Sequence, residues 1–505
     1  MNKLGINTLS NIIAKLWGMV SIFIFVPLYI RFLGESAYGL VSFFSILQST
    51  LNLLGLGLSN TLRREFAIGD ANDANKERKY KLLRSVENIY FLIGLIIIAI
   101  CSFGSGIISN KWLNIEALDP QMVTNVIVLM GISIALQIID NMYSGCLFGL
   151  DHQVYANVLY VLWAASKSVG SVIIAWRFKD LTLFYAWHCA NDLIYLVVLR
   201  ISIQRLLKCG RKLKWAPKDF SNLKVIWKYT IGILLISFIA IINKQLDKIV
   251  ISRYLTLTEL GAYNVATTLG SLIAIFPSAL YTTVFTKFTN DVSRNDDVAV
   301  EVTFIPLNKI SNVVICTMGA FVAFFSLPLI RLWTGSSVYV NTLGMTAFFV
   351  VMAMAVAEFQ EIPYALALAH GHTKTNIIVG VCFIPFLFFM TQYFIKHHGL
   401  LGAGVVYLAL MVGQSLLYES LIYRRFLKTS PMKLILMDTI LPLVVAVAFA
   451  FVCKILCEKI TKNHIVLSVL GCLSGGLTLV IMMIIFAKND INGLIQRRTQ
   501  DDTTR

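Results

Sequence analysis

Basic residues inside apolar stretches are the side chains of this chain best placed to do chemistry. Lys15, Lys244 and Lys248 each interrupt an apolar run of about 20 residues, the length that spans a bilayer. A charge at the bilayer centre costs about 2.5–3.5 kcal/mol on the mildest scale, so it normally faces a cavity or a partner. With Arg31 and Arg63 near helix ends, these lysines predict a cationic cavity that binds a phosphate or diphosphate group. The open alternative for each lysine is a structural salt bridge.

Acidic residues in the same kind of stretch are candidates for carrying a coupling proton or Na⁺. They are Asp140, Asp247, Glu358 and Glu361. The two glutamates share one helix face, and Asp247 lies on the same polar helical stripe as Lys244 and Lys248. Packing or a helix-end position is the alternative reading of the glutamates.

Lys167 and Asp192 have a different interpretation. Both are central on neighbouring apolar segments, so they are predicted to form an inert structural ion pair.

Composition sets the class of protein. The chain has 505 residues, 57% of them hydrophobic and 14% charged, with a mean hydropathy of +0.75. Such a chain has too little polar surface for a soluble domain, so we expect an all-α polytopic membrane protein with about fourteen transmembrane helices. The expected helices are 9–32, 37–62, 86–109, 122–149, 154–176, 181–203, 225–252, 258–286, 304–330, 341–369, 375–395, 401–423, 434–457 and 464–487.

The distribution of positive charge predicts orientation. The net charge of +16 could suggest nucleic acid, but Lys and Arg cluster in alternate loops at 63–85, 200–228 and 424–433 and in the C-terminal tail. That is the positive-inside pattern of a membrane protein, so no nucleic-acid partner is expected. Both termini should be cytoplasmic.

A weak internal duplication predicts two six-helix lobes. The turn after Arg31 has a counterpart after Arg253, and the end of the fourth helix has one near the end of the tenth. Repeats of this kind occur in transporters with the substrate site between the lobes. The expected parts are an N-terminal lobe (1–206), a basic linker with an amphipathic helix (207–224), a C-terminal lobe (225–428), an extra helix pair (429–490) and a cytoplasmic tail (491–505).

Motifs of enzymes are not evident. The nine cysteines are scattered, and the histidine pairs at 370–372 and 397–398 are expected on opposite membrane faces, so we predict no metal site. A phosphate-cradling glycine loop followed by Lys-Ser/Thr is lacking, so the chain should not hydrolyse ATP. A glycan polymerase would want a long outer loop, which the expected topology does not offer. We therefore expect a protein that is not an enzyme.

Several motifs resemble a known family. The run from Pro27 through Arg31-Phe-Leu-Gly-Glu-Ser-Ala-Tyr-Gly39, the following Arg63-Arg-Glu, and Leu246-Asp-Lys-Ile-Val-Ile251 with Gly261-Ala-Tyr resemble the Wzx-type polysaccharide-transport flippases of the multidrug/oligosaccharidyl-lipid/polysaccharide exporter superfamily. The resemblance covers most of the chain and weakens after about residue 400.

The resemblance implies a fold like those of the multidrug extrusion transporters and the lipid II flippase. It implies ion-coupled transfer of an undecaprenyl-diphosphate-linked oligosaccharide, such as an O-antigen repeat unit, from the cytoplasmic to the periplasmic leaflet of the bacterial inner membrane. Membrane lipids, a polysaccharide polymerase and a chain-length regulator are the implied partners. No cofactor is expected beyond the coupling H⁺ or Na⁺. A multidrug antiporter and a lipid II flippase for peptidoglycan remain the alternatives.

Overall fold

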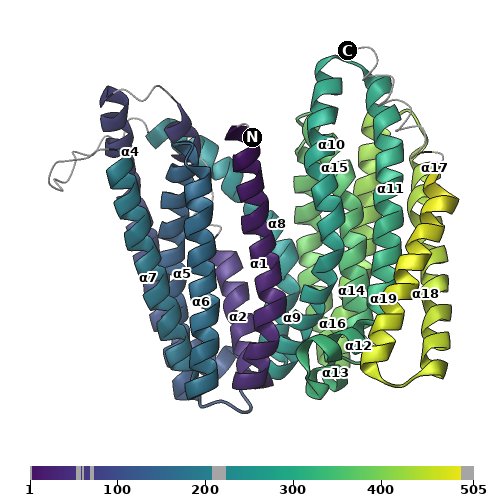
Figure 1. The fold of residues 1–505 in the computed structure, drawn as a ribbon, viewed down its shortest axis with the longest axis horizontal. Helices are drawn as coiled ribbons and strands as arrows, with labels where there is room; N and C mark the ends of the chain where they lie inside the picture. The colour runs from purple at the N-terminus through teal and green to yellow at the C-terminus, as the bar shows by residue number, and fades with distance from the viewer. Residues whose placement is uncertain are drawn as a thin grey trace. The chain divides into compact units, whose positions relative to one another are not determined.

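The computed structural model describes residues 3–52, 59, 62–68, 73–207, 223–488 and 490. Throughout these ranges the named elements are all helical, and the only pairing of extended backbone is an isolated bridge between Asn114 and Thr256 (Figure 1). The predicted all-α fold is therefore confirmed. The linker residues 208–222 and the tail 491–505 lie outside the described residues.

The helices of the first half are long and nearly contiguous. They are α1 (Lys3–Leu33), α2 (Glu35–Leu51), α4 (Asp73–Ile107), the π-helix η1 (Ile108–Trp112), α5 (Pro120–Gly149), α6 (Gln153–Phe178), α7 (Leu181–Leu206) and α8 (Leu223–Tyr254).

The second half has more interruptions. Its elements are α9 (Leu257–Gly270), η2 (Ser271–Ala274), α10 (Ile275–Ser293), α11 (Asp297–Phe324), α12 (Ser326–Thr334), α13 (Ser337–Leu343), α14 (Thr346–Ala357), η3 (Glu358–Gln360), α15 (Glu361–Ala369), α16 (Lys374–Phe426), α17 (Pro431–Leu434), η4 (Ile435–Ile440), α18 (Leu441–Ile460), α19 (His464–Met482) and η5 (Met483–Ala487).

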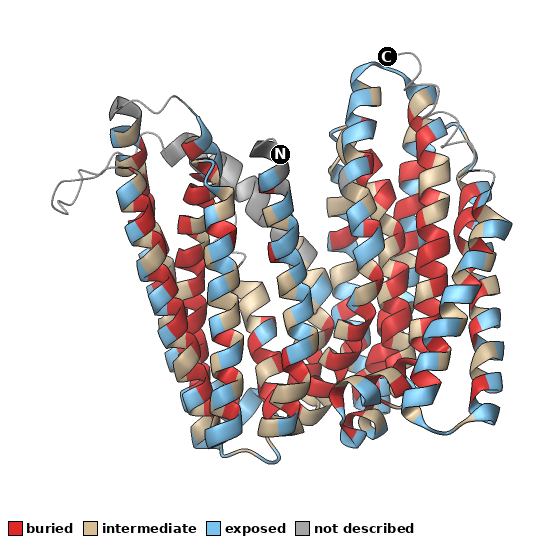
Figure 2. Ribbon diagram, in the orientation of Figure 1, coloured by how far each residue is buried: buried red, intermediate tan, exposed pale blue. Residues whose placement is uncertain are grey.

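The chain divides into two compact units. One comprises Met1–Gln245 with Thr256–Thr258, and the other comprises Leu246–Leu255 with Glu259–Arg505, so the division falls inside α8. In the first unit α5 is buried along much of its length and packs against α4, α6 and α7. In the second unit α11 has the same role, packing against α10, α14, α18 and α19 (Figure 2). These two helices form the centres of the two cores.

Acidic caps explain where several of these helices begin. The side chain of Asp119 accepts hydrogen bonds from the backbone N–H groups of Gln121 and Met122, and Pro120 occupies the first turn of α5. Asp180 caps α7 and Asp296 caps α11 in the same way. Each cap satisfies backbone donors that have no partner within the helix.

Eleven helices in the described ranges are long and apolar enough to cross a membrane, so the chain is a multi-pass membrane protein. The expected number of about fourteen stays a prediction. One of the eleven, α16, has 53 residues and contains Gly399 at φ 58° and ψ −142°, a conformation that breaks helical geometry. It covers both helices expected at 375–395 and 401–423, which meet at this glycine because it tolerates positive φ.

One expected boundary is wrong. The loop expected at 63–85 is helical from Asp73 onward, because Lys and Glu are good helix formers and Glu77 pairs with Lys81 one turn away at 3.0 Å. The span expected at 341–369 is found as one membrane-length segment, Thr346–Ala369, in which the 3₁₀ turn η3 joins α14 to α15. Pro363 removes one backbone donor and its ring clashes with the carbonyl of residue 359, which accounts for this turn.

Close packing of α4 against α5 depends on Gly131. A Cβ atom there would lie 2.4 Å from Cβ of Cys101, whereas a Cβ at Gly106 would meet nothing within 4 Å. We expect Gly131→Ala to lower the free energy of unfolding by about 1–3 kcal/mol through overpacking. Gly106→Ala is the matched control and should cause no loss. Thermal unfolding of the purified protein in detergent measures both, and equal stability of the two variants would contradict this packing.

Candidate functional site

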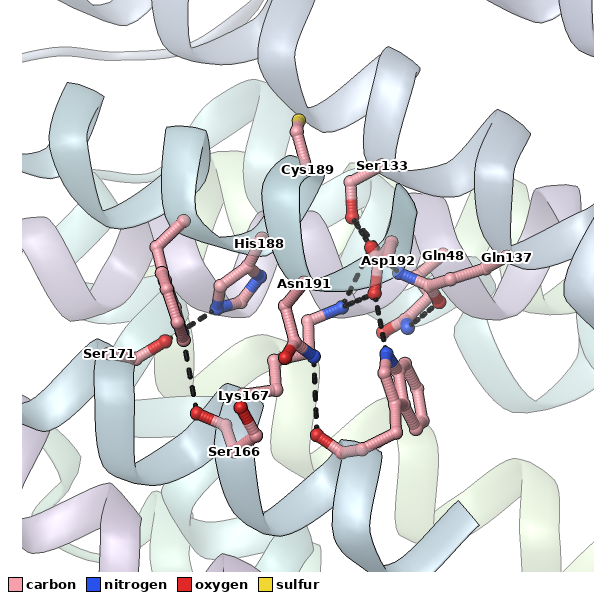
Figure 3. A network of polar contacts seen from close by, with 12 residues as sticks. Gln48, Ser133, Gln137, Ser166, Lys167, Ser171, His188, Cys189, Asn191 and Asp192 are labelled. Atoms are coloured by element: carbon pink, nitrogen blue, oxygen red, sulfur yellow. Dashed lines mark hydrogen bonds and ion pairs between the residues drawn. The ribbon is translucent and has the colours of Figure 1, made fainter. Parts of the chain in front are cut away.

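A buried network of polar side chains surrounds Asp192 in the first unit (Figure 3). Asp192, on α7, is fully buried, and its two oxygens lie 2.9 and 3.0 Å from Nζ of Lys167 on α6. Ser133 and Gln137 of α5 donate to the same carboxylate at 2.5 and 3.1 Å. Trp163 donates its indole N–H at 3.0 Å. The structure therefore brings together Lys167 and Asp192 in the pairing expected from the sequence.

Neutral groups complete this network. Gln48 of α2 donates to the side-chain carbonyl of Gln137, which links a fourth helix to it. The Trp163 ring stacks on Tyr195 with centroids 5.0 Å apart, and the Lys167 ammonium lies 5.0 Å from the centre of the Trp163 ring. A carboxylate held by one cation and three neutral donors is a stable arrangement, because every lone pair that loses water gains a partner.

Asp140 lies near this ion pair but does not join it. It is 3% exposed on α5, close enough to Asp192 and Lys167 to interact electrostatically. Neither of its carboxyl oxygens has a hydrogen-bond partner among the described residues. A buried ionised carboxyl without a partner is very costly, so this group favours its neutral, protonated form.

Lys15 extends a polar face of α1. On that face Asn11 donates a hydrogen bond to Gln153 at 3.2 Å and accepts one from Asn157 at 2.6 Å. These bonds join α1 to the start of α6. One turn further, Lys15 is exposed, and no ion pair or hydrogen bond of its ammonium occurs within the described part of the chain. Its charge is available to a ligand.

Arg31 lies apart from this position. Arg31 is sixteen residues further along α1 than Lys15, or about 24 Å along the helix axis, which is more than one diphosphate can bridge. Arg31 packs beside Phe32, and Arg63 lies 4.9 Å from the centre of the Phe148 ring. Both arginines are exposed.

Lys244 and Lys248 occupy successive turns of α8. Lys244 is exposed, whereas Lys248 is half-buried beside Asp247. Asp247 is 1% exposed and accepts a hydrogen bond of 2.8 Å from the Tyr263 hydroxyl. Asp247 therefore interacts with Tyr263 and Lys248. Of the two lysines, Lys244 is the exposed one.

Glu358 and Glu361 flank the break between α14 and α15. Both are half-buried, and Gln360 between them donates to Ser415 at 2.9 Å. The two glutamates thus begin a 3₁₀ turn and the next helix, and their spacing of three residues, one full 3₁₀ turn, places them on the same face.

Sequence reasoning missed the neutral partners of the ion pair. Ser133 and Gln137 are one helical turn apart on α5, a spacing that indicates one polar face of an apolar helix. Trp163 and Gln48 carried no such signal because isolated polar or aromatic residues are common in membrane helices. Glu419, a buried glutamate on α16, also interrupts an apolar segment, but the sequence alone assigns it no role.

Comparison with known proteins identifies the family. Residues 4–286 match the family described as polysaccharide biosynthesis protein. The chain belongs to this family. It is 20% identical over 411 residues to a protein of Shigella flexneri named "Putative O-antigen transporter", covering 78% of this chain and 91% of that one.

Solved structures show the same fold as this member of the polysaccharide biosynthesis family. The lipid II flippase MurJ in an inward closed conformation matches with a TM-score of 0.73 at 15% identity, over 96% of this chain and 99% of that one. An inward-facing multidrug resistance MATE transporter of the MOP superfamily matches with a TM-score of 0.63 at 14% identity, over 82% and 94%. The predicted similarity to both folds is confirmed, and they are folds of flippases and transporters.

The Lys167–Asp192 pair yields a stability prediction. Lys167→Met should lower the free energy of unfolding by about 3–5 kcal/mol, because it leaves a buried carboxylate without its cation. The double variant Lys167→Met/Asp192→Asn removes both charges and should recover most of that loss. Chemical or thermal unfolding in detergent measures the free energy of unfolding of both variants. A double variant as unstable as Lys167→Met, or less stable, would show that the two charges are not coupled.

Proposed function

We propose that this protein is a flippase for an undecaprenyl-diphosphate-linked oligosaccharide, an O-antigen or other surface-polysaccharide repeat unit. It moves this lipid from the cytoplasmic to the periplasmic leaflet of the bacterial inner membrane, with both termini in the cytoplasm. It catalyses no covalent step. A polysaccharide polymerase and a chain-length regulator are its proposed partners.

The observation that carries the proposal is the open charge of Lys15 in an apolar helix. A lysine in such a helix is costly unless it has an ion-pair partner or a ligand. Lys15 is exposed and unpaired within the described ranges, in contrast to Lys167, which is fully engaged. Lys244 is similarly exposed on α8. Ammonium groups are common ligands of phosphate, so a diphosphate headgroup fits these positions. Lys248 is a further proposed diphosphate ligand, whereas Arg31 and Arg63 are proposed to attract the diphosphate at the rims.

Membership of the polysaccharide biosynthesis family supports an oligosaccharide cargo. A lipid II flippase is the second candidate, because lipid II also carries a polyprenyl diphosphate and the MurJ structure shares the fold. A multidrug antiporter fits less well, since cationic drugs would be repelled by open lysines.

Ion coupling is proposed to act through an acid of the chain. Asp140 is the best supported, because its buried carboxyl has no partner within the described residues and can exchange a proton without breaking an existing bond. Asp247, Glu358 and Glu361 remain candidates, with H⁺ or Na⁺ as the coupling ion.

Neutralising the open lysines tests the cargo. Lys15→Gln and Lys244→Gln should each slow flipping of a polyprenyl-diphosphate oligosaccharide in reconstituted vesicles about ten- to hundredfold, since a hydrogen bond to a charged group contributes about 1.5–3 kcal/mol. Surface polysaccharide in cells should fall accordingly. Lys462→Gln removes an exposed lysine between α18 and α19 and should leave flipping unchanged.

The cargo is separated from its alternatives in the same vesicles. The proposed function expects transfer of the oligosaccharide lipid and little transfer of lipid II or of a cationic dye. Preferential transfer of lipid II would establish the second candidate, and export of the dye with unchanged activity of both lysine variants would contradict a diphosphate cargo.

Asp140→Asn tests the coupling acid. This variant should lose the acceleration of flipping by an imposed pH gradient while slow flipping without a gradient persists, because the neutral amide mimics only the protonated state. Glu77→Gln, at an exposed position of α4, is the control. A pH response equal to that of the wild type would exclude Asp140.

A further inference from the structure

Glu419 is a buried acid of the second unit. It lies on α16 with 1% of its surface exposed. Neither carboxyl oxygen has a hydrogen-bond partner within the described residues, and the ion pairs found there do not include it. An ionised carboxyl in such a place is strongly disfavoured. The group therefore needs a proton or another cation.

Two hydroxyl groups face this carboxyl. They belong to Tyr423, one turn further along α16, and Thr439, in the π-helix η4. Asn308 of α11 donates its amide to the Tyr423 oxygen at 3.1 Å, and Asn312 donates to the Thr439 oxygen at 2.9 Å. Three helical elements thus converge on one acid.

The direction of these bonds decides what the acid can bind. Each hydroxyl oxygen already accepts a hydrogen from an asparagine amide, so its own O–H hydrogen is free to point to the carboxyl. A metal ion such as Na⁺ would need the oxygen lone pairs instead. The arrangement therefore offers donors to a carboxylate and suits a group that exchanges a proton.

The charged residues next to Asn308 and Thr439 along the chain are paired with one another. Lys309 of α11 lies 3.9 Å from Asp438 of η4 and 3.3 Å from Asp490. The Cys316 thiol, also on α11, donates to the backbone carbonyl of Thr439 at 3.8 Å. The π-helical turn that carries Thr439 is a geometry often found at functional positions.

We propose that Glu419 is a proton-binding site. A proton from water adds to one carboxylate oxygen and forms a neutral acid, and its release returns it to water while the Tyr423 and Thr439 hydroxyls stabilise the carboxylate. The site goes beyond the proposed coupling acids and does not depend on which lipid is carried.

Infrared spectroscopy of the purified protein in vesicles tests this site directly. The carbonyl stretch of protonated carboxyl groups should lose one component in Glu419→Gln, and in the wild type the same component should disappear as the pH is raised. Glu301→Gln is the matched control. The Glu301 carboxylate accepts hydrogen bonds from the backbone of Lys428 and Thr429, so its removal should leave the band unchanged.

A second variant covers the case in which Glu419→Gln does not fold. Tyr423→Phe should keep the component and move it to higher frequency, because it removes a hydroxyl that faces the carboxyl and can donate to it. Asp140→Asn should remove a different component, so failure of the proposed coupling acid is distinguishable from failure of this site. Three results would overturn the proposal: a Glu419→Gln spectrum identical to the wild type, an unchanged frequency in Tyr423→Phe, or loss of the component on adding Na⁺ at constant pH.

Discussion

The free energy of placing a charge among apolar helices is the constraint on which this structure depends. A side chain that loses water must gain a partner, bind a ligand or become neutral. Asp192 meets this requirement inside the protein, with Lys167 and three neutral donors around its carboxylate. That network joins α2, α5, α6 and α7, so the cost of one buried charge is offset by contacts that fix the first unit.

Other charges lack this solution, and that difference separates structure from function. Asp140 and Glu419 are buried without partners in the described ranges, which favours neutral acids that exchange protons. Lys15 is exposed and unpaired in the same ranges, so its ammonium is open to a ligand. The same physical requirement thus has three outcomes. A buried charge with a partner forms a structural pair, a buried acid without one binds a proton, and an exposed cation binds an anion.

Much of this could be predicted from the sequence. Long apolar segments and loop charges indicated the helical membrane fold, and the central positions of Lys167 and Asp192 on neighbouring segments indicated their pairing. The exact place of the 3₁₀ turn η3 could not be predicted, because a proline within an apolar helix has several structural outcomes. The surroundings of Glu419 could not be predicted from the sequence. Asn308 lies more than a hundred residues before Tyr423 and Thr439 along the chain and meets them only after folding.

The most direct test of the central claim is the affinity of the purified protein for polyprenyl diphosphate compared with polyprenyl monophosphate. Native mass spectrometry of the wild type and of a Lys15→Gln/Lys244→Gln variant measures both. The diphosphate should bind the wild type more tightly, and the variant should lose most of that preference because its open charges are gone. Equal affinity of the wild type for the two lipids, or an undiminished preference in the variant, would contradict a diphosphate site at these lysines.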